Sequence, residues 1–313
     1  MTLPSVKRAL VIALLLAWPT AATIPQDVPQ PDDLLQSAEE WVRENIDENL
    51  LAALDDIDQD RVRKFFTELQ RRFEGTSVYD LGSLKETASR LLPVLQQFEE
   101  TKPYAAWLQA HLDYFDAAEE LRREAKPVPP QPEAPAQLPG PSLRIQRTVW
   151  KKQLQKRPWP PLAQNYVPRL KQIFIEERMP PELVWVAEVE SAFDPKALSP
   201  AGAAGLFQLM PITARTWKLA RLPRDERFQP EKNARAAALQ LRSLYRHYGD
   251  WKLALAAYNV GASRVDQLLK QQHARTFEAI ASRLPAETQM YVPKVEATLR
   301  RREGLALEDL KLS

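Results

Sequence analysis

The sequence predicts an all-α protein made of two helical domains joined by a proline-rich linker. Apolar residues recur every three to four positions on both sides of residues 126–141, which is the spacing of amphipathic helices. Between these two helical halves, seven of the fifteen residues from Pro127 to Pro141 are proline. The length of 313 residues and the 44% apolar content suffice for two domains with a sizeable core, and they exclude wholesale disorder.

The first 22 residues are predicted to form a secretory signal peptide rather than part of the fold. Lys7 and Arg8 precede an unbroken apolar run from Ala9 to Trp18, and small residues ending at Ala22 offer a cleavage site. The apolar run has about half of the ~20 residues that a membrane-spanning helix needs. Because the chain has no cysteine, we expect no lipid anchor. The expectation is therefore an exported protein, with cleavage of the signal left open.

Charge divides the rest of the chain into two parts of opposite sign. Residues 23–125, the predicted acidic helical domain, have 11 Lys and Arg against 23 Asp and Glu, a net charge of −12. Residues 126–313 have a net charge of +12 and comprise the linker, 126–141, and a second helical domain, 142–313. The linker is expected to act as a semi-rigid spacer. The asymmetry is compatible with docking of one domain on the other, with a protein partner of the acidic domain, and with two separately solvated surfaces.

The acidic domain is expected to contain helices whose apolar stripes form its core. The helical spacing is clearest over residues 34–46 and 62–73. Ser83 followed by Glu86 fits a capping box at the start of a helix, and Pro103 fits the first turn of the next one. No catalytic spacing occurs among these residues. We interpret the aromatic stripes as core and assign no chemistry to this domain.

In the second domain, a short helix beginning near Pro181 places a carboxyl group on an apolar face. Leu183, Ala187 and Glu190 have the spacing i, i+4, i+7 and share one side of that helix, whereas Glu188 points elsewhere. Partial burial raises the pKa of a carboxyl group and keeps a proton available near neutral pH. A helix-terminal glutamate satisfied by nearby backbone or by an arginine is an equally good interpretation of Glu190.

Two further segments of this domain have features of a binding site. Residues 197–211 form a loop with two of the chain's eight glycines, and Gln208 within it can both donate and accept hydrogen bonds. The loop lacks the Lys-Ser/Thr that follows the glycines of a phosphate loop. Asp250 is expected to cap a helix that ends at residues 257–261, where tyrosine and asparagine before glycine could also be a plain C-terminal cap.

Four segments of the chain together resemble the motifs of the lytic transglycosylase (SLT) family. They are Glu190-Ser191, residues 197–211, Ala257-Tyr258-Asn259 and residues 287–293, and they occur in the family's order and spacing. The last segment is most similar to the membrane-bound transglycosylase D subgroup. The resemblance covers roughly residues 142–300. It implies a lysozyme-like helical fold and cleavage of the β-1,4 bond between N-acetylmuramic acid and N-acetylglucosamine in peptidoglycan, in the periplasm or cell envelope.

The resemblance also implies roles for individual residues. Glu190 corresponds to the family's single catalytic acid. Phe207 departs from the methionine that is usual at its position, and we expect it to tune the pocket. Glu287 corresponds to a second acid that binds substrate or the peptide stem, although a first-turn charge stabilised by the helix dipole fits it as well. The positions that match substrate-binding residues are Ser199, Gln208, Met210, Tyr258, Asn259 and Glu287.

The acids near Glu190 in sequence suggest how such an enzyme would work. Glu188 lies on another face of the helix, and Asp194 before Pro195 is typical of a turn. Ordinary glycosidases need two carboxylates, so with one placed acid the sugar's own acetamido group would assist. The product would be a 1,6-anhydromuramic end, formed without water. The alternatives are a hydrolytic muramidase and a non-catalytic peptidoglycan-binding or envelope-assembly protein on the same fold.

Other classes of chemistry have little support. The absence of cysteine excludes disulfides, thiolate metal sites and a cysteine nucleophile. His111, His247 and His273 are the three histidines, and they do not have the spacing of metal ligands. Export and the absence of a basic-aromatic module count against nucleic-acid binding by the +12 half. We therefore expect peptidoglycan glycan strands as the partner, and no metal, cofactor or nucleic acid.

Overall fold

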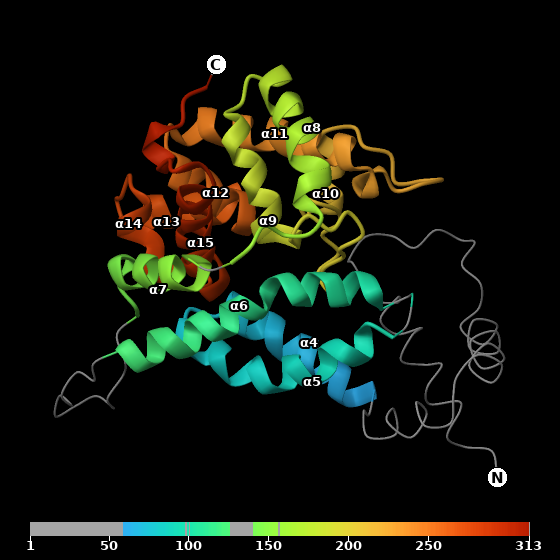
Figure 1. Ribbon diagram of the computed structural model, residues 1–313. Coiled ribbons are helices and arrows are strands. Elements are labelled where there is room, and N and C mark those ends of the chain that lie inside the picture. Colours follow the sequence, from blue (N-terminus) through green and yellow to red (C-terminus); the bar gives the residue numbers. More distant parts are fainter. Residues whose placement is uncertain (1–58, 98, 100, 126–139, 156, 313) are drawn as a thin grey trace, which may run out of the picture.

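The computed structural model describes residues 59–97, 99, 101–125, 140–155 and 157–312 (Figure 1). In these ranges the chain forms α-helices and short 3₁₀ helices, and its only β-type pairings are two isolated bridges. The predicted all-α class is therefore confirmed. The predicted signal peptide, the expected helix at 34–46 and most of the proline-rich linker lie outside the described residues.

The N-terminal helices pack side by side in the lower part of Figure 1. Their amphipathic stripes face one another, and those aromatic residues expected to be core that lie within the described ranges are buried. Pro103 occupies the first turn of its helix, as the sequence predicts, because proline lacks only an N–H that would be unpaired there. The helices are α4 (Gln59–Glu74), α5 (Lys85–Leu95) and α6 (Lys102–Glu124), with a 3₁₀ helix (Val78–Leu84) between α4 and α5.

The capping box expected at Ser83 and Glu86 is absent. The helix α5 begins at Lys85, and its N-terminus has no side-chain cap. Ser83 lies inside the preceding 3₁₀ helix, where its hydroxyl donates to the backbone carbonyl of Asp80 at 2.9 Å. The prediction was wrong because the tight turn before α5 redirects the serine to its own backbone.

The C-terminal part forms the upper unit of Figure 1, where α15 lies beside α12. Asp250 caps α12 as predicted, since its carboxylate accepts a hydrogen bond from the backbone N–H of Leu253 at 2.8 Å. None of the helices in the described ranges is long and apolar enough to cross a membrane. The helices are α7 (Leu143–Gln155), α8 (Ala163–Glu176), α9 (Val186–Ser191), α10 (Pro211–Thr216), α11 (Pro230–Tyr248), α12 (Trp251–Val260), α13 (Ala262–Gln271), α14 (Phe277–Ile280) and α15 (Ala286–Glu303).

The described residues form two apolar cores, and the second crosses the boundary predicted at residue 142. The larger core belongs to α8 and the helices that follow it. The smaller core joins the N-terminal helices to Val149 and Trp150 of α7 and to Ala286 and Met290 of α15. The helices α7 and α15 therefore bury apolar side chains against the acidic N-terminal helices.

Polar contacts fix α15 against these N-terminal helices. At its start, the N–H of Ala286 donates to the carbonyl of Gly75 at 2.6 Å, and the Gln289 amide donates to the carbonyl of Thr76 at 2.8 Å. Further along, the Lys294 ammonium lies 2.8 Å from the Asp113 carboxylate of α6, and both side chains are almost completely buried. The acidic and basic parts of the chain are thus in direct contact.

Candidate active site

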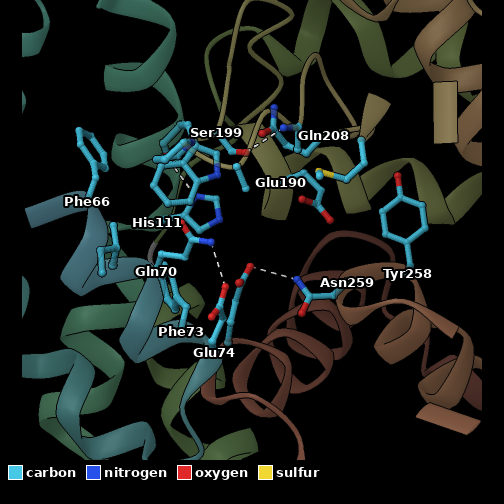
Figure 2. A pocket seen from close by; sticks show the side chains of 17 residues that line it. Phe66, Gln70, Phe73, Glu74, His111, Glu190, Ser199, Gln208, Tyr258 and Asn259 are labelled. Carbon is cyan, nitrogen blue, oxygen red and sulfur yellow. Dashed lines mark hydrogen bonds between the residues drawn. The ribbon is translucent and has the colours of Figure 1, made fainter. Parts of the chain in front are cut away.

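One pocket gathers all seven residues that the sequence singled out for a site (Figure 2). It is bounded by the end of α9, the loop over 197–211, the end of α12 and the start of α15. Their roles stay predictions, but segments far apart in the chain meet here. The seven residues are Glu190, Ser199, Gln208, Met210, Tyr258, Asn259 and Glu287.

Glu190 lies in the last turn of α9, with its carboxyl group directed into the pocket. The helix ends one residue later, at Ser191, because Ala192 and Phe193 adopt left-handed conformations, with φ of 51° and 63°. The side chain is only 8% exposed, and its Oε1 accepts a hydrogen bond from the Tyr291 hydroxyl at 2.7 Å. Burial raises the pKa of Glu190 to about 8, although the Tyr291 hydrogen bond acts in the opposite direction. The carboxyl group therefore keeps its proton near neutral pH.

The two acids that are close to Glu190 in sequence are both engaged elsewhere. Glu188 forms a buried ion pair with Arg302, with distances of 2.7 and 2.9 Å. Asp194 accepts a hydrogen bond from the backbone N–H of Lys196 at 2.8 Å, as a turn residue does. Neither lines the pocket, in agreement with the sequence analysis.

Two other acids reach the pocket from distant parts of the chain. Glu287 comes from the first turn of α15 and Glu74 from the end of α4. Burial raises the pKa of Glu287, and this is opposed by the Asn259 amide, which donates to Glu287 Oε1 at 3.0 Å. The Asn259 carbonyl oxygen accepts from the Thr288 hydroxyl at 2.6 Å, which orients its amide toward Glu287. The acids nearest to Glu190 in sequence are therefore not the acids that share its pocket.

The loop over 197–211 approaches neighbouring backbone so closely at Gly205 that a residue with a side chain does not fit there. Gly205 has φ of 82°, and a Cβ atom there would lie 2.0 Å from the carbonyl oxygen of Arg227 and 2.5 Å from Nδ2 of Asn233. No L-residue fits such a position without displacing its neighbours. Gln208, three residues later, also has a positive φ of 45°, so the loop holds a strained residue at the pocket.

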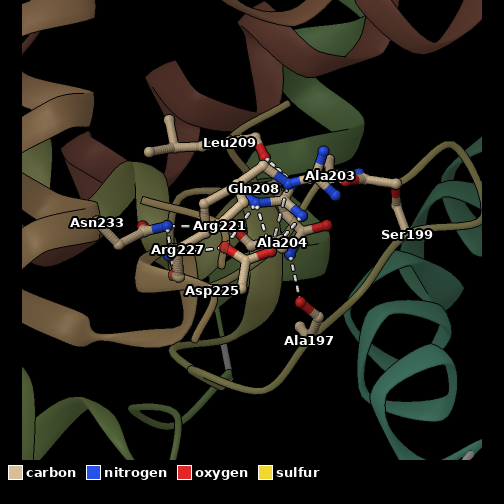
Figure 3. A network of polar contacts seen from close by, with 11 residues as sticks. Ala197, Ser199, Ala203, Ala204, Gln208, Leu209, Arg221, Asp225, Arg227 and Asn233 are labelled. Carbon is tan, nitrogen blue, oxygen red and sulfur yellow. Dashed lines mark hydrogen bonds and ion pairs between the residues drawn. The ribbon is translucent and has the colours of Figure 1, made fainter. Parts of the chain in front are cut away.

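Two buried side chains that the sequence analysis missed hold this loop (Figure 3). The Arg227 guanidinium donates to the carbonyl oxygens of Gly202 and Leu209 at 2.7 and 2.8 Å, and an ion pair with Asp225 compensates its charge. Asn233 accepts from the N–H of Phe207 at 2.8 Å and donates to the Ala204 carbonyl at 3.1 Å. Neither residue stands in a recognisable motif, so only the tertiary contacts identify them.

Gln208 and Ser199 also use part of their hydrogen-bonding capacity inside the loop. The Gln208 amide nitrogen donates to the carbonyl oxygens of Ala197 and Gly205 at 3.1 and 2.9 Å. Its Oε1 is buried and has no partner among the described residues. The Ser199 hydroxyl oxygen accepts from the N–H of Ala203 at 2.9 Å. Both residues line the pocket while they fix the shape of its edge.

The expectation that Phe207 tunes the pocket is wrong. Its side chain is fully buried and stacks on Phe174 with 5.5 Å between the ring centroids. What Phe207 contributes toward the site is its backbone carbonyl, which accepts from the Tyr258 hydroxyl at 2.7 Å. The residue is turned inward because the aromatic ring completes the larger core. Met210, by contrast, is 38% exposed and forms an apolar edge of the pocket.

The N-terminal helices form one wall of the pocket, although the sequence analysis assigned them no chemistry. His111 in this wall is buried, and burial lowers its pKa to about 4, so its ring is neutral near pH 7. Within the described ranges, no group of acidic and histidine side chains is arranged to hold a metal ion. The wall residues are Phe66, Leu69, Gln70, Phe73 and Glu74 of α4, and Trp107 and His111 of α6.

Comparison with known protein families places these observations in a wider context. The sequence from residue 172 to residue 281 matches the family described as transglycosylase SLT domain. This part of the chain is therefore similar to SLT domains. It contains Glu190, the loop over 197–211, Tyr258 and Asn259, whereas Glu287, Tyr291 and the N-terminal wall lie outside the matched residues.

Curated relatives match a part of the chain. Over 126 residues, the chain is 40% identical to the membrane-bound lytic murein transglycosylase D of Escherichia coli, covering 39% of this chain and 28% of the relative. Over 122 residues, it is 38% identical to the soluble lytic murein transglycosylase of Salmonella typhimurium, covering 36% of this chain and 19% of the relative. The chain thus covers less than a third of the length of these relatives.

Among solved structures, the 70 kDa soluble lytic transglycosylase of Escherichia coli aligns with 98% of this chain and 63% of its own. The alignment has a TM-score of 0.41 and a sequence identity of 20%.

Proposed function

We propose that the protein is a lytic transglycosylase that cleaves the β-1,4 bond between N-acetylmuramic acid and N-acetylglucosamine in peptidoglycan. The observation that carries this proposal is the buried, proton-retaining carboxyl group of Glu190 in the pocket beside the SLT loop. The relatives, which are named lytic murein transglycosylases, support the same reaction class. A protonated carboxylic acid in a concave site is what a glycosidic leaving group needs.

In the proposed reaction, Glu190 acts first as an acid and then as a base. It protonates the glycosidic oxygen while the acetamido oxygen of the muramic residue attacks the anomeric carbon and displaces the leaving sugar. The Glu190 carboxylate then removes the proton of the 6-hydroxyl group. The 6-oxygen attacks the anomeric carbon, releases the acetamido oxygen and closes the 1,6-anhydro ring. Glu190 regains its proton and no water is consumed, so the cleavage is that of a lyase.

The other pocket residues would bind the glycan strand around this bond. Met210 offers an apolar edge for a sugar face, and Ser199 has a hydroxyl hydrogen available for a ligand. Tyr258 and Asn259 also line the pocket, and the Asn259 amide donates to the Glu287 carboxyl group. In this proposal Glu287 contacts substrate or its peptide stem.

Replacement of Glu190 by glutamine tests the proposed role. Glutamine keeps the shape of the side chain but has no ionisable proton, so we expect Glu190→Gln to abolish release of soluble muropeptides from purified sacculi. Glu182→Gln, in the segment just before α9 and outside the pocket, is the matched control and should leave release unchanged. Release by Glu190→Gln at the original rate would refute the assignment.

A hydrolytic muramidase is the second candidate, because a second carboxyl group, that of Glu287, lines the same pocket. A second carboxylate could activate water or stabilise the reaction centre, as in ordinary glycosidases. Mass spectrometry of the released muropeptides separates the two candidates. Products with 1,6-anhydromuramic ends support the lytic transglycosylase, and products that are heavier by one water support the muramidase.

The proposed substrate implies that the protein works in the periplasm or cell envelope. The predicted signal peptide at residues 1–22 provides the route for export. Cell fractionation of the full chain and of a variant with Lys7 and Arg8 replaced by glutamate tests this location. Retention of the variant in the cytoplasm is the expected outcome.

A further inference from the structure

The wall that α4 contributes to the pocket lies outside the residues matched to the SLT domain. Gln70, Phe73 and Glu74 have the spacing i, i+3, i+4, so they share one face of this helix. Figure 2 shows them on one side of Glu190, with Tyr258 and Asn259 on the other side. A substrate that reaches Glu190 thus lies between the N-terminal helices and the SLT domain.

The position of this wall relative to Glu190 is fixed by direct contacts. The residues just after α4, Gly75 and Thr76, accept hydrogen bonds from Ala286 and Gln289 of α15. The same helix α15 carries Tyr291, whose hydroxyl is bonded to Glu190. Substrate contacts made by α4 are therefore held in register with the acid.

The wall combines aromatic side chains with solvent-accessible polar groups. Phe73 packs edge-on against Trp107 with 6.4 Å between ring centroids, and Trp107 stacks on His111 at 4.3 Å. Gln70 donates to Glu74 Oε1 at 2.9 Å, which orients the two side chains together. The exposed Glu74 carboxylate has no cationic partner among the described residues, and the Gln70 carbonyl oxygen also remains available. Packing between helices accounts for the aromatic side chains of the wall, but it does not account for the two polar side chains at the pocket.

We propose that Gln70, Phe73 and Glu74 bind an N-acetylhexosamine residue of the glycan strand next to the bond that is cleaved. The hydroxyl and acetamido N–H groups of a sugar are donors that match the Glu74 carboxylate and the Gln70 carbonyl. The apolar face of the ring fits the aromatic edge at Phe73. This inference rests on the proposed glycan substrate, and it adds a binding site from the acidic helices that determines how the strand is held.

Oligosaccharide binding by full-length Glu190→Gln protein tests the wall separately from catalysis. The probes are oligomers of N-acetylglucosamine from the disaccharide to the hexasaccharide, which carry no peptide. On this background we compare Gln70→Ala/Glu74→Ala with Thr67→Ala, an exposed position of α4 outside the pocket. We expect the double variant to lose about tenfold in affinity for the hexasaccharide, because two hydrogen bonds are removed, and Thr67→Ala to bind like its parent.

A second measurement separates substrate binding from damage to the fold. With Glu190 intact, the double variant should raise KM for solubilised glycan strands with kcat nearly unchanged, and its melting temperature should match that of Thr67→Ala. Unchanged hexasaccharide affinity in the double variant overturns the proposal that this wall binds a sugar. The same result is expected if this face contacts a peptide stem instead, so that alternative also overturns the proposal. A parent that binds none of the oligomers overturns it as well. Neither result affects the proposed function, because that is decided by the muropeptides that the parent protein and Glu190→Gln release from sacculi.

Discussion

At the scale of single residues, the environment of Glu190 couples its chemistry to the stability of the protein. Its pKa is about 8 in the folded protein, against 4.5 as the ordinary value. Between these two pH values the folded state holds a proton that the unfolded state has released. This carboxyl group therefore makes folding less favourable as the pH rises from about 4.5 to about 8.

Glu190→Gln should stabilise the protein, and the gain should depend on pH. Folding keeps the Glu190 carboxyl group protonated at a pH where the unfolded chain would release the proton, and this lowers the free energy of unfolding by roughly 3 kcal/mol at pH 7 but only slightly at pH 5. Glutamine does not ionise, so the substitution removes this loss. Denaturant unfolding of both proteins at pH 5 and pH 7 measures the difference. An equal difference at the two pH values would show that Glu190 is not shifted by burial.

Tyr291→Phe should shift the alkaline limb of the pH profile of kcat/KM to higher pH. The Tyr291 hydroxyl donates to Glu190 and lowers its pKa, so its removal raises the pKa further and keeps Glu190 protonated to higher pH. The loss of a hydrogen bond that orients the carboxyl group should also reduce kcat/KM by about tenfold. The measurement is kcat/KM from pH 5 to pH 10. Tyr245→Phe, in a ring stack with Trp251 outside the pocket, is the control that should leave the limb in place.

At the scale of elements, the loop over 197–211 shows how backbone geometry positions a site. Its shape depends on one glycine against the Arg227 carbonyl and on two buried side chains from outside the loop. Since these groups hold Gln208 in a left-handed conformation, a small shift in any of them moves the edge of the pocket.

Gly205→Ala should be far more costly than Gly249→Ala. Both glycines have positive φ, 82° and 65°, so both substitutions incur backbone strain of about 1 kcal/mol. Only at position 205 does the new Cβ collide with backbone, whereas nothing lies within 4 Å at position 249. We expect Gly205→Ala to cost about 3 kcal/mol more, as measured by denaturant unfolding, together with loss of activity. Equal costs would contradict the close approach.

At the scale of the whole molecule, buried charge joins the N-terminal helices to the helix that supports Glu190. Asp113 of α6 contacts Lys294 at 2.8 Å and Arg157 at 2.7 Å. Lys294 also lies 4.3 Å from the centre of the Tyr114 ring, and burial lowers the pKa of its ammonium group. An ion pair this deep requires both partners, because an unpaired buried charge is poorly solvated.

Asp113→Asn should therefore destabilise the whole protein by about 3 kcal/mol, because it leaves the buried Lys294 without its counter-charge. Adding Lys294→Met should recover part of this loss, since the unpaired cation is then gone. Denaturant unfolding of the single and double variants gives the coupling.

The control is the pair of Lys152 and Glu120, which also joins the two parts of the chain but has an exposed lysine. Lys152→Met should cost less than about 1 kcal/mol. A cost for Asp113→Asn as small as that of Lys152→Met would contradict the importance of burial.

The sequence by itself determined what depends on near neighbours in the chain. Helical periodicity predicted the all-α class, and local chemistry predicted the first turn at Pro103 and the cap at Asp250. All seven residues that the resemblance to family motifs singled out line the pocket, since short motif segments are visible without a structure. The capping box at Ser83 shows the limit of local rules, because the adjacent 3₁₀ turn competed for the same hydroxyl.

Only the tertiary structure decided which distant segments meet. Tyr291 lay within a recognised motif, one turn after Glu287, but its partner Glu190 could not be read from the spacing. The sequence also did not reveal that Arg227 and Asn233 support the loop, or that α4 forms a wall of the pocket. Hydrogen bonds and packing between remote segments leave no periodic signal in the sequence. The pKa of Glu190 depends on that enclosure: a sequence shows that a carboxyl group is present, and the surrounding fold decides whether it keeps its proton.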